Sequence, residues 1–309
     1  MNIEPIVVCT EALHPRPEAW LRERCTLVHA APDSPELRDA LRDARGLVIR
    51  TYTTVDRVLL DAAPRLEVVA RAGVGLDQVD QAACAERGIA VLNTPDANTQ
   101  AVVEYVFRLL LGAVRPLDRL DHALDGPRWR ARRAEQVAQR ELASCTLGIL
   151  GLGRIGRRVA TVARSFGMAV QYHDLVAIDD APDGAHAVDA DTLFATSDIL
   201  TIHIDGRAEN RQVVNAQRLE SMRPDVMLVN AARGFVLDHA ALAAFLRAHP
   251  AASAHLDVHD PEPFDDDHPL LACANAFLYP HLAAKTDSAM EAMSWVVRDM
   301  MSRLTGVSE

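Results

Sequence analysis

Three glycines spaced as Gly-x-Gly-x-x-Gly are the first residues whose pattern suggests chemistry. Gly151, Gly153 and Gly156 follow a short apolar run, "TLGIL", and open a helical pattern. The first glycine permits a tight turn, the second lets a pyrophosphate approach the backbone, and the third lets the helix pack on the strand. The helix N-terminus then offers N–H groups and a positive dipole end to the phosphates. The pattern predicts a dinucleotide-binding loop.

The residues around this loop complete the fingerprint. Arg154 and Ile155 stand at the start of the helix, where the arginine can add a charge contact to a phosphate. Asp174 ends the next strand pattern, 18 residues after Gly156. A carboxylate there accepts hydrogen bonds from the adenosine ribose and repels a 2′-phosphate, so we expect NAD rather than NADP. The alternative is an incidental glycine turn in a flavodoxin-like sheet.

Three residues further along the chain have the types needed for proton transfer on a hydroxy acid. Oxidising a hydroxyl carbon by hydride transfer requires a base, and a substrate carboxylate requires an anchor such as arginine. Arg233 follows the strand pattern "VMLVNAA", Glu262 lies in the loop after "AHLDV", and His281 ends "AFLYP". Ligands of open α/β sheets bind at the carboxyl ends of the strands, so we expect these residues at the nicotinamide's sheet edge.

Each of these residues also has a less specific interpretation. Arg233 can be an ordinary surface arginine, and Glu262 belongs to an acidic loop that continues into three aspartates. His203 also ends a strand pattern and rivals His281 as the acid–base group. The Asp/His-rich segment 257–268 suggests a metal site, but two prolines break its ligand spacing, so we expect no metal.

Short β-rich runs alternate with helical patterns along most of the chain, which predicts parallel α/β sheets. We expect two doubly wound units, at about 1–98 and 99–282. An apolar helical pattern at 98–115 suits deep burial or a subunit interface. Residues 286–309 predict one amphipathic helix that can pack on either unit.

Composition narrows the class of protein. The 309 residues are 49% hydrophobic and 24% charged, which is ordinary for a globular protein of two domains. The net charge of −11 argues against nucleic-acid and anionic-membrane binding. The N-terminus lacks a signal-peptide pattern, and no run of 18 apolar residues predicts a membrane span. The five scattered cysteines include no C-x-x-C, so we expect a reduced, cytoplasmic protein.

Five motifs together resemble the D-isomer-specific 2-hydroxyacid dehydrogenases. They occur in the family's order, from about residue 46 to 290: "RAGVGLDQVD", "GILGLGRIGRRVA", "LVNAARGFVLD", "LDVHDPEP" and "YPHLAAKT". The stretches "GLVIRTYTTV" and "VLNTPDAN" are most similar to members acting on D-3-phosphoglycerate. The chain ends at Glu309, so we expect no C-terminal regulatory domain of the longer members.

The resemblance implies roles for individual residues. His281 would be the acid–base group, Glu262 its partner, and Arg233 the anchor of the substrate carboxylate. The implied substrate contacts are backbone N–H groups at Val74 and Gly75 and, in phosphoglycerate-type members, the phosphate ligands Arg50 and Arg71. The implied cofactor contacts include Asp257, at the nicotinamide amide, together with His203 and Ala231.

The resemblance also implies an architecture. Residues 1–98 and 283–309 would form a flavodoxin-like substrate-binding domain, and residues 99–282 a Rossmann-type NAD-binding domain. The long helix from about 99 would join two subunits in a homodimer.

Several positions depart from the family pattern. Asp205 replaces a proline, and "LAAK" replaces a small, glycine-containing run after the histidine. Tyr52 and Thr54 differ from the residues common in phosphoglycerate enzymes, so glyoxylate, hydroxypyruvate and other 2-oxo acids stay open as substrates. An NAD-responsive scaffold or corepressor on the same fold is the alternative from a different class.

Overall fold

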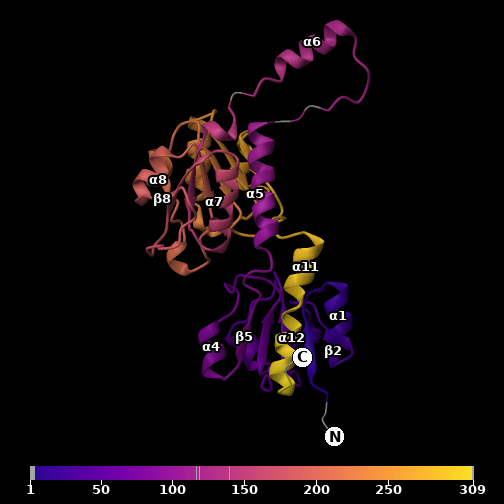
Figure 1. The fold of residues 1–309 in the computed structure, drawn as a ribbon. Helices are drawn as coiled ribbons and strands as arrows, with labels where there is room; N and C mark the ends of the chain where they lie inside the picture. The colour runs from indigo at the N-terminus through magenta and orange to yellow at the C-terminus, as the bar shows by residue number, and fades with distance from the viewer. Residues whose placement is uncertain (1–3, 116, 118, 139, 308–309) are drawn as a thin grey trace. The chain divides into compact units, whose positions relative to one another are not determined.

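A computed structural model describes residues 4–115, 117, 119–138 and 140–307. The chain divides into two compact units, the first Met1–Ala101 with Ala284–Glu309 and the second Val102–Ala283. Each unit contains one sheet, of five and seven strands respectively, and all strand pairs in both sheets are parallel (Figure 1). The predicted fold class, two doubly wound parallel-sheet domains, is confirmed.

The first unit has the strand order β2-β1-β3-β4-β5, which is the flavodoxin-like order. Its strands are β1 Ile6–Cys9, β2 Thr26–His29, β3 Gly46–Ile49, β4 Val68–Arg71 and β5 Ala90–Leu92. Its helices are α1 Pro15–Arg22, α2 Pro35–Leu41, α3 Arg57–Asp61, α4 Gln81–Glu86, α11 Asp287–Ser294 and α12 Val296–Thr305. Buried residues of α1 and α12 cover one face of the sheet, and those of α2, α3 and α4 cover the other.

The C-terminal segment is not the single helix that the sequence predicts. It consists of α11 and α12, which meet at Trp295, whose ψ of −2° departs from helical geometry. The Trp295 ring packs edge-on against Trp20 with centroids 6.1 Å apart, and the Arg298 guanidinium lies 3.9 Å from its centroid. The contact with Trp20 attaches the segment to α1, which a helical period alone does not reveal.

The second unit has the order β12-β11-β10-β9-β6-β7-β8, and its direction of winding reverses between β6 and β9. Its strands are β6 Thr146–Leu150, β7 Ala169–His173, β8 Ala185–Ala187, β9 Ile199–Ile202, β10 Met227–Asn230, β11 Ser253–Leu256 and β12 Ala276–Leu278. The helices are α5 Thr99–Val114, whose residues 99–101 belong to the first unit, α6 Gly126–Glu135, α7 Arg154–Ser165, α8 Ala190–Thr196, α9 Ala216–Ser221 and α10 His239–Ala248. Short 3₁₀ turns lie at Leu142–Ser144, Ala208–Asn210, Gly234–Val236 and Pro269–Ala272.

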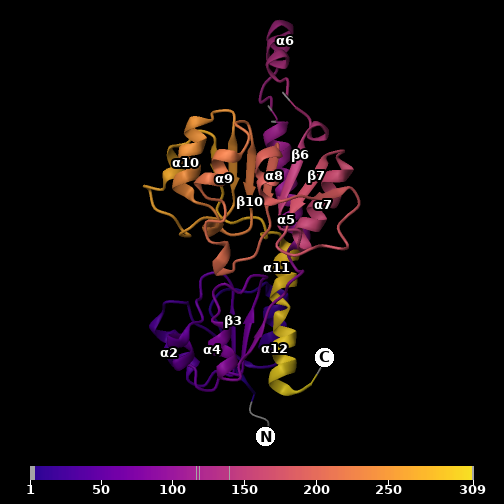
Figure 2. The ribbon, with the colours of Figure 1, turned by 90° about the vertical axis from the view of Figure 1, so that its left-hand side faces the viewer.

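Two apolar cores sandwich this larger sheet. Helices α8, α9 and α10 lie on one face, and α7 and the buried residues of α5 lie on the other (Figure 2). Helix α6, which the sequence analysis missed, is exposed along its whole length. Among the described residues, no helix is both long and apolar enough to span a membrane.

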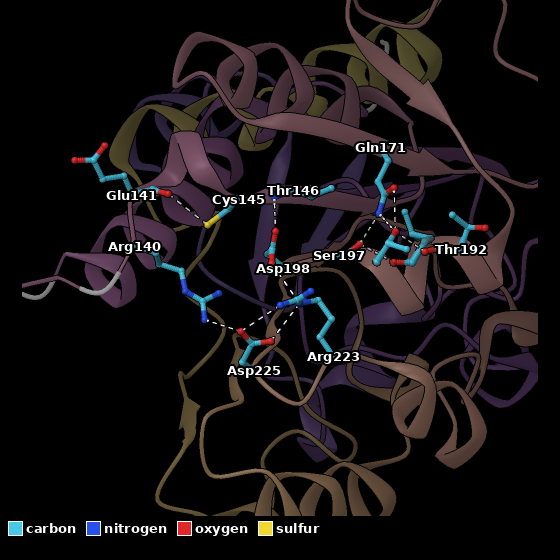
Figure 3. Close-up of polar contacts among 12 residues, drawn as sticks. Arg140, Glu141, Cys145, Thr146, Gln171, Thr192, Ser197, Asp198, Arg223 and Asp225 are labelled. Atoms are coloured by element: carbon cyan, nitrogen blue, oxygen red, sulfur yellow. Dashed lines mark hydrogen bonds and ion pairs between the residues drawn. The ribbon is translucent and has the colours of Figure 1, made fainter.

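A polar cluster ties together the amino ends of the central strands (Figure 3). Asp198 accepts a hydrogen bond from the backbone N–H of Thr146 at 2.8 Å and pairs with Arg223 at 3.2 Å. Asp225 joins Arg223 to Arg140, at 3.2 and 3.1 Å. This cluster is structural, because the ligands of such sheets bind at the opposite, carboxyl edge.

Candidate active site

The turn after β6 excludes side chains at two of its glycines. Gly151 has a φ of +94°, in the left-handed region that favours glycine. A Cβ at Gly151 would lie 2.8 Å from the backbone oxygen of His203, and one at Gly156 would lie 2.2 Å from the backbone oxygen of Gly151. The end of β6, the first turn of α7 and the loop after β9 are therefore in direct contact.

The N-terminus of α7 adjoins open space beside this turn. Gly153 is the N-cap of the helix, and a Cβ there would meet no atom within 4 Å. Arg154 and Ile155 are the first two residues of this helix of 12 residues. The first N–H groups of a helix lack intrahelical partners and carry its positive end. These features fit the pyrophosphate of NAD.

Asp174 lies one residue beyond β7, beside the glycine turn. Its Oδ2 accepts a hydrogen bond from the backbone N–H of Leu152 at 2.7 Å, and its Oδ1 accepts from Val176 at 3.4 Å. These contacts fix the half-buried carboxylate while leaving it further accepting capacity. The position fits a hydrogen bond to ribose hydroxyls.

His203 and Asp205 follow β9, across the point where the winding reverses. The Nε2 of His203 lies 2.9 Å from Thr201 Oγ1, and burial lowers the pKa of His203 to about 4. A neutral ring paired with a hydroxyl is a poor rival to His281 as the acid–base group. Asp205 binds Arg207 through both carboxylate oxygens, at 2.7 and 2.5 Å, so this departure from the family pattern adds little net charge.

His281 and Glu262 form a hydrogen-bonded pair at the carboxyl edge of the sheet. The Nδ1 of His281 lies 2.8 Å from Glu262 Oε2, and the side chains are 42% and 30% exposed. Burial acts to raise the pKa of Glu262, but the hydrogen bond and charge of His281, with the N–H of His259, bring it below its ordinary value. Glu262 is therefore ionised near neutral pH, and Nε2 is the His281 nitrogen that points away from it.

A turn centred on His281 holds its ring in place. His281 has a φ of +55°, which is uncommon for a residue other than glycine, and its N–H donates to the Asp257 backbone oxygen at 2.9 Å. The carboxylate of Asp257 accepts from the N–H groups of Leu282 and Ala283, both at 2.8 Å. Burial raises the pKa of Asp257 against the lowering effect of these two N–H groups. Asp257 thus supports the turn, and its nicotinamide contact stays a prediction.

Arg233 lies three residues beyond β10 in a loop that also contains Ala231. The fully buried Asn230 fixes this loop: its Nδ2 donates to the Arg233 backbone oxygen at 2.8 Å, and its Oδ1 accepts from the Ala232 N–H at 3.0 Å. The Nη1 of Arg233 donates to the Ala232 backbone oxygen at 2.7 Å. The following residue, Gly234, contacts the loop that contains Glu262, so the structure brings the loops of the three predicted catalytic residues together.

In the first unit, Arg50 follows β3, at the point where the winding of that sheet reverses. Its Nη1 donates to the Ala12 backbone oxygen at 2.8 Å, and its Nη2 lies 2.8 Å from Met290 Sδ. The carboxylate of Glu11 accepts from the three consecutive N–H groups of residues 50–52, at 3.1, 2.8 and 3.0 Å. The carboxylate of Glu11 therefore already accepts hydrogen bonds from the N–H groups to which a bound anion could otherwise bind.

Arg71, Val74 and Gly75 lie at the end of β4 and in the loop after it. The Arg71 guanidinium covers Gly73, where a Cβ would lie 1.1 Å from Nη1. The Val74 backbone oxygen accepts from Asn93 Nδ2 at 2.6 Å, which anchors the loop to the segment after β5. Arg50, Arg71, Val74 and Gly75 thus share one sheet edge, the carboxyl edge of β3 and β4.

Four residues that support these loops were not predicted from the sequence, namely Glu11, Asn230, Gly234 and His259. Asn230, Gly234 and His259 lie inside the motifs "LVNAARGFVLD" and "LDVHDPEP". Their nearness in sequence to the predicted site residues was the signal that could have identified them. The partners of Glu11 and Gly234, and the Tyr279 partner of His259, are distant in sequence, so only the folded chain identifies these contacts.

Comparison with known proteins agrees with this geometry. Residues 107–283 match the family model described as the D-isomer specific 2-hydroxyacid dehydrogenase, NAD binding domain. A D-lactate dehydrogenase from Aquifex aeolicus, solved with NAD and lactic acid, is structurally similar, with a TM-score of 0.85, 27% identity, and coverage of 97% of this chain and 96% of that one. The predicted cofactor, NAD, is therefore confirmed at the level of the family.

Two curated relatives illustrate the range of substrates. The D-3-phosphoglycerate dehydrogenase of Archaeoglobus fulgidus is 35% identical over 82% of this chain and 48% of its own length. The glyoxylate reductase of Aeropyrum pernix is 37% identical over 82% of this chain and 78% of its own length. The chain spans about half the length of most of the curated phosphoglycerate relatives that it matches. It belongs to the D-isomer specific 2-hydroxyacid dehydrogenases, a family of NAD-dependent oxidoreductases.

Proposed function

We propose that this protein interconverts a D-2-hydroxy acid and its 2-oxo acid, using NAD(H). The observation that carries the proposal is the His281–Glu262 pair, 2.8 Å apart, at the carboxyl edge of the sheet that bears the dinucleotide turn. NAD(H), when bound, accepts or supplies the hydride. The chain's own residues must then bind the acid and move one proton.

The proposed catalytic roles follow from the charges and donors of three residues. In the direction of reduction, the Nε2 of His281 donates a proton to the substrate oxygen, and ionised Glu262 stabilises the imidazolium that precedes this step. The guanidinium of Arg233 binds the substrate carboxylate through two N–H groups and polarises the adjacent carbonyl. The N–H groups of Val74 and Gly75 are further proposed ligands of that carboxylate.

The proposed cofactor contacts come from the glycine turn and the loops beside it. The pyrophosphate contacts are Gly151, Gly153, Arg154, Ile155 and Gly156, and the remaining contacts are Asp174, His203, Ala231 and Asp257. The carboxylate of Asp174 disfavours a 2′-phosphate by charge repulsion, which supports a preference for NAD over NADP.

We propose 3-phosphohydroxypyruvate and D-3-phosphoglycerate as the first substrate pair. Two observations support this pair. Several relatives are named D-3-phosphoglycerate dehydrogenase. In addition, Arg50 and Arg71 lie at one sheet edge. One observation favours the second candidate, glyoxylate or hydroxypyruvate: the Arg50 guanidinium already binds Ala12 and Met290, and Glu11 lies beside it. A phosphate would have to replace those contacts.

The test is a steady-state comparison of 3-phosphohydroxypyruvate, hydroxypyruvate, glyoxylate and 2-oxoglutarate with NADH. A kcat/KM that is at least about tenfold higher for the phosphorylated compound, equivalent to 1.4 kcal/mol, supports the first pair. A preference for glyoxylate or hydroxypyruvate supports the second. Tight NADH binding with no turnover of any 2-oxo acid supports a scaffold or corepressor and contradicts the enzymatic proposal.

We further propose that the protein is a homodimer in a reducing, cytoplasmic setting. The five cysteines are free and buried, which is consistent with that setting. Helix α6 has no buried residue and exposes half of Trp129, so a second subunit is the proposed cover for this segment. Light scattering of the purified protein tests the homodimer.

A further inference from the structure

We propose that His259 is a positioning residue that fixes Glu262 relative to the turn containing His281; the inference rests on the proposed function. The backbone N–H of His259 donates to Glu262 Oε1 at 2.6 Å, while Glu262 Oε2 binds His281 Nδ1. The His259 ring Nε2 lies 2.9 Å from the backbone oxygen of Tyr279, two residues before His281. One residue therefore holds both members of the pair.

The hydrogen-bond partner determines the form of the ring. A backbone oxygen can only accept, so the Nε2 of His259 must carry the proton. The Nδ1 is buried and has no hydrogen-bond partner among the described residues. The ring therefore donates through Nε2 to the backbone oxygen of Tyr279.

Aromatic packing fixes the direction of that donor. His259 is only 7% exposed, and its ring lies edge-on to Phe264, with centroids 4.6 Å apart. His268 contacts both rings and is hydrogen-bonded to His239, with 3.1 Å between His268 Nε2 and His239 Nδ1. The rings of His259, Phe264 and His268 therefore pack against one another as one aromatic layer.

The same residue also touches the loop of Arg233. Gly234, the next residue, lies so close to the His259 backbone that a Cβ would be 1.9 Å from its carbonyl atoms. His259 thus contacts Glu262, the segment that leads to His281, and the glycine that follows Arg233. Phenylalanine could fill the same space, but it could not donate to Tyr279, so the hydrogen bond is the specific contribution of histidine.

Three variants separate positioning from packing. His259→Phe keeps an aromatic ring and the backbone N–H but loses the side-chain donor, so we expect kcat to fall about tenfold, the equivalent of one lost hydrogen bond. KM for the 2-oxo acid and the Kd for NADH should stay within about twofold. His259→Gln presents an amide N–H toward Tyr279 and should recover most of kcat. His268→Phe replaces a neighbouring buried histidine that is hydrogen-bonded to His239, and this variant should retain the native kcat.

A spectroscopic measurement keeps the test independent of turnover. The NMR signals of the His281 ring are compared in the native protein, in His259→Phe and in Glu262→Gln. Signals in His259→Phe that move toward those of Glu262→Gln, while those of His268→Phe stay unchanged, support the positioning role. This result supports it even if no 2-oxo acid is turned over. A lack of turnover would contradict only the proposed function. Native kcat and native His281 signals in His259→Phe, or no recovery in a folded His259→Gln, would overturn the inference.

Discussion

Gly234 lies directly against the backbone carbonyl of His259, so that a Cβ on the glycine would be 1.9 Å from both carbonyl atoms. Real Cβ atoms do not approach so closely, and the obstacle is backbone rather than a flexible side chain. The loop after β10 and the loop after β11 are therefore in contact at a position where only glycine fits. This contact places Arg233 beside the loop of Glu262.

Replacing Gly234 by alanine should separate these two loops. We expect Gly234→Ala to lower kcat/KM at least about tenfold and to destabilise the fold by about 1–3 kcal/mol, as overpacking does. Thermal unfolding and steady-state kinetics measure the two effects. Gly112→Ala in α5 is the matched control, because a Cβ there meets only Arg108 at 3.4 Å. Native kinetics in Gly234→Ala would contradict the role of this contact.

The charge of Glu262 should matter for catalysis rather than for cofactor binding. Its pKa is lowered, with the His281 hydrogen bond and charge overcoming the effect of burial, so the carboxylate is ionised at pH 6–8. Glu262→Gln keeps the shape but removes the charge, and we expect kcat to fall about 10- to 100-fold. In His281→Ala, kcat should fall by about 100- to 10,000-fold, because this substitution removes the proton donor itself.

NADH affinity, measured by fluorescence titration, should remain near native in both variants. Glu209→Gln, on the exposed turn after β9, controls for loss of one negative charge. A near-native kcat in His281→Ala would reject its assignment as the acid–base group.

Asp174 should control the choice between NAD and NADP. Asp174→Ala removes both the proposed ribose acceptor and the acceptor of the Leu152 N–H, so we expect NADH to bind about tenfold more weakly. The loss of negative charge should reduce the discrimination against NADPH. The ratio of kcat/KM for the two cofactors is the measurement, with the exposed Asp179→Asn as control. An unchanged ratio would contradict the role of Asp174.

Most strands could be predicted from the sequence because their signals are local, although the short strand β8 was not among them. The strand pattern "TLGIL" coincides with β6, and the three glycines predict the turn that the structure contains. The break at Trp295 was not predicted, because a helical period continues across it and the ring contacts of Trp295 are with Trp20, far away in sequence. Helix α6 was missed because it has no apolar face to produce a period.

Supporting residues were harder to predict than the residues that they support. Asn230 binds backbone groups of its own loop and the His259 ring binds a backbone oxygen of another segment, and such contacts leave no recurring pattern in a sequence. Glu11 binds N–H groups about 40 residues away. A carboxylate facing three backbone N–H groups is evident only once β1 and β3 are neighbours.

Buried histidines should make the protein less stable in mild acid. Burial lowers the pKa of His255 from 6.5 to about 4, and burial with the nearby charges of His268 and His259 lowers that of His239 to about 4. Between pH 6.5 and 4 the unfolded chain binds protons that the folded chain does not, so the free energy of unfolding falls as the pH falls. Each group should contribute a loss on the order of 2 kcal/mol at pH 5.

Urea unfolding between pH 4 and 8 measures this dependence, and one substitution assigns part of it. His255 stacks on Phe277 with centroids 4.6 Å apart, so His255→Phe keeps the packing while removing the titrating group. We expect its unfolding free energy to depend on pH less steeply, by up to about 1.4 kcal/mol per pH unit, the equivalent of one proton. Substituting the exposed His186 by glutamine should leave the slope native. If His255→Phe retains the native slope, His255 is not one of the groups that the folded chain keeps unprotonated.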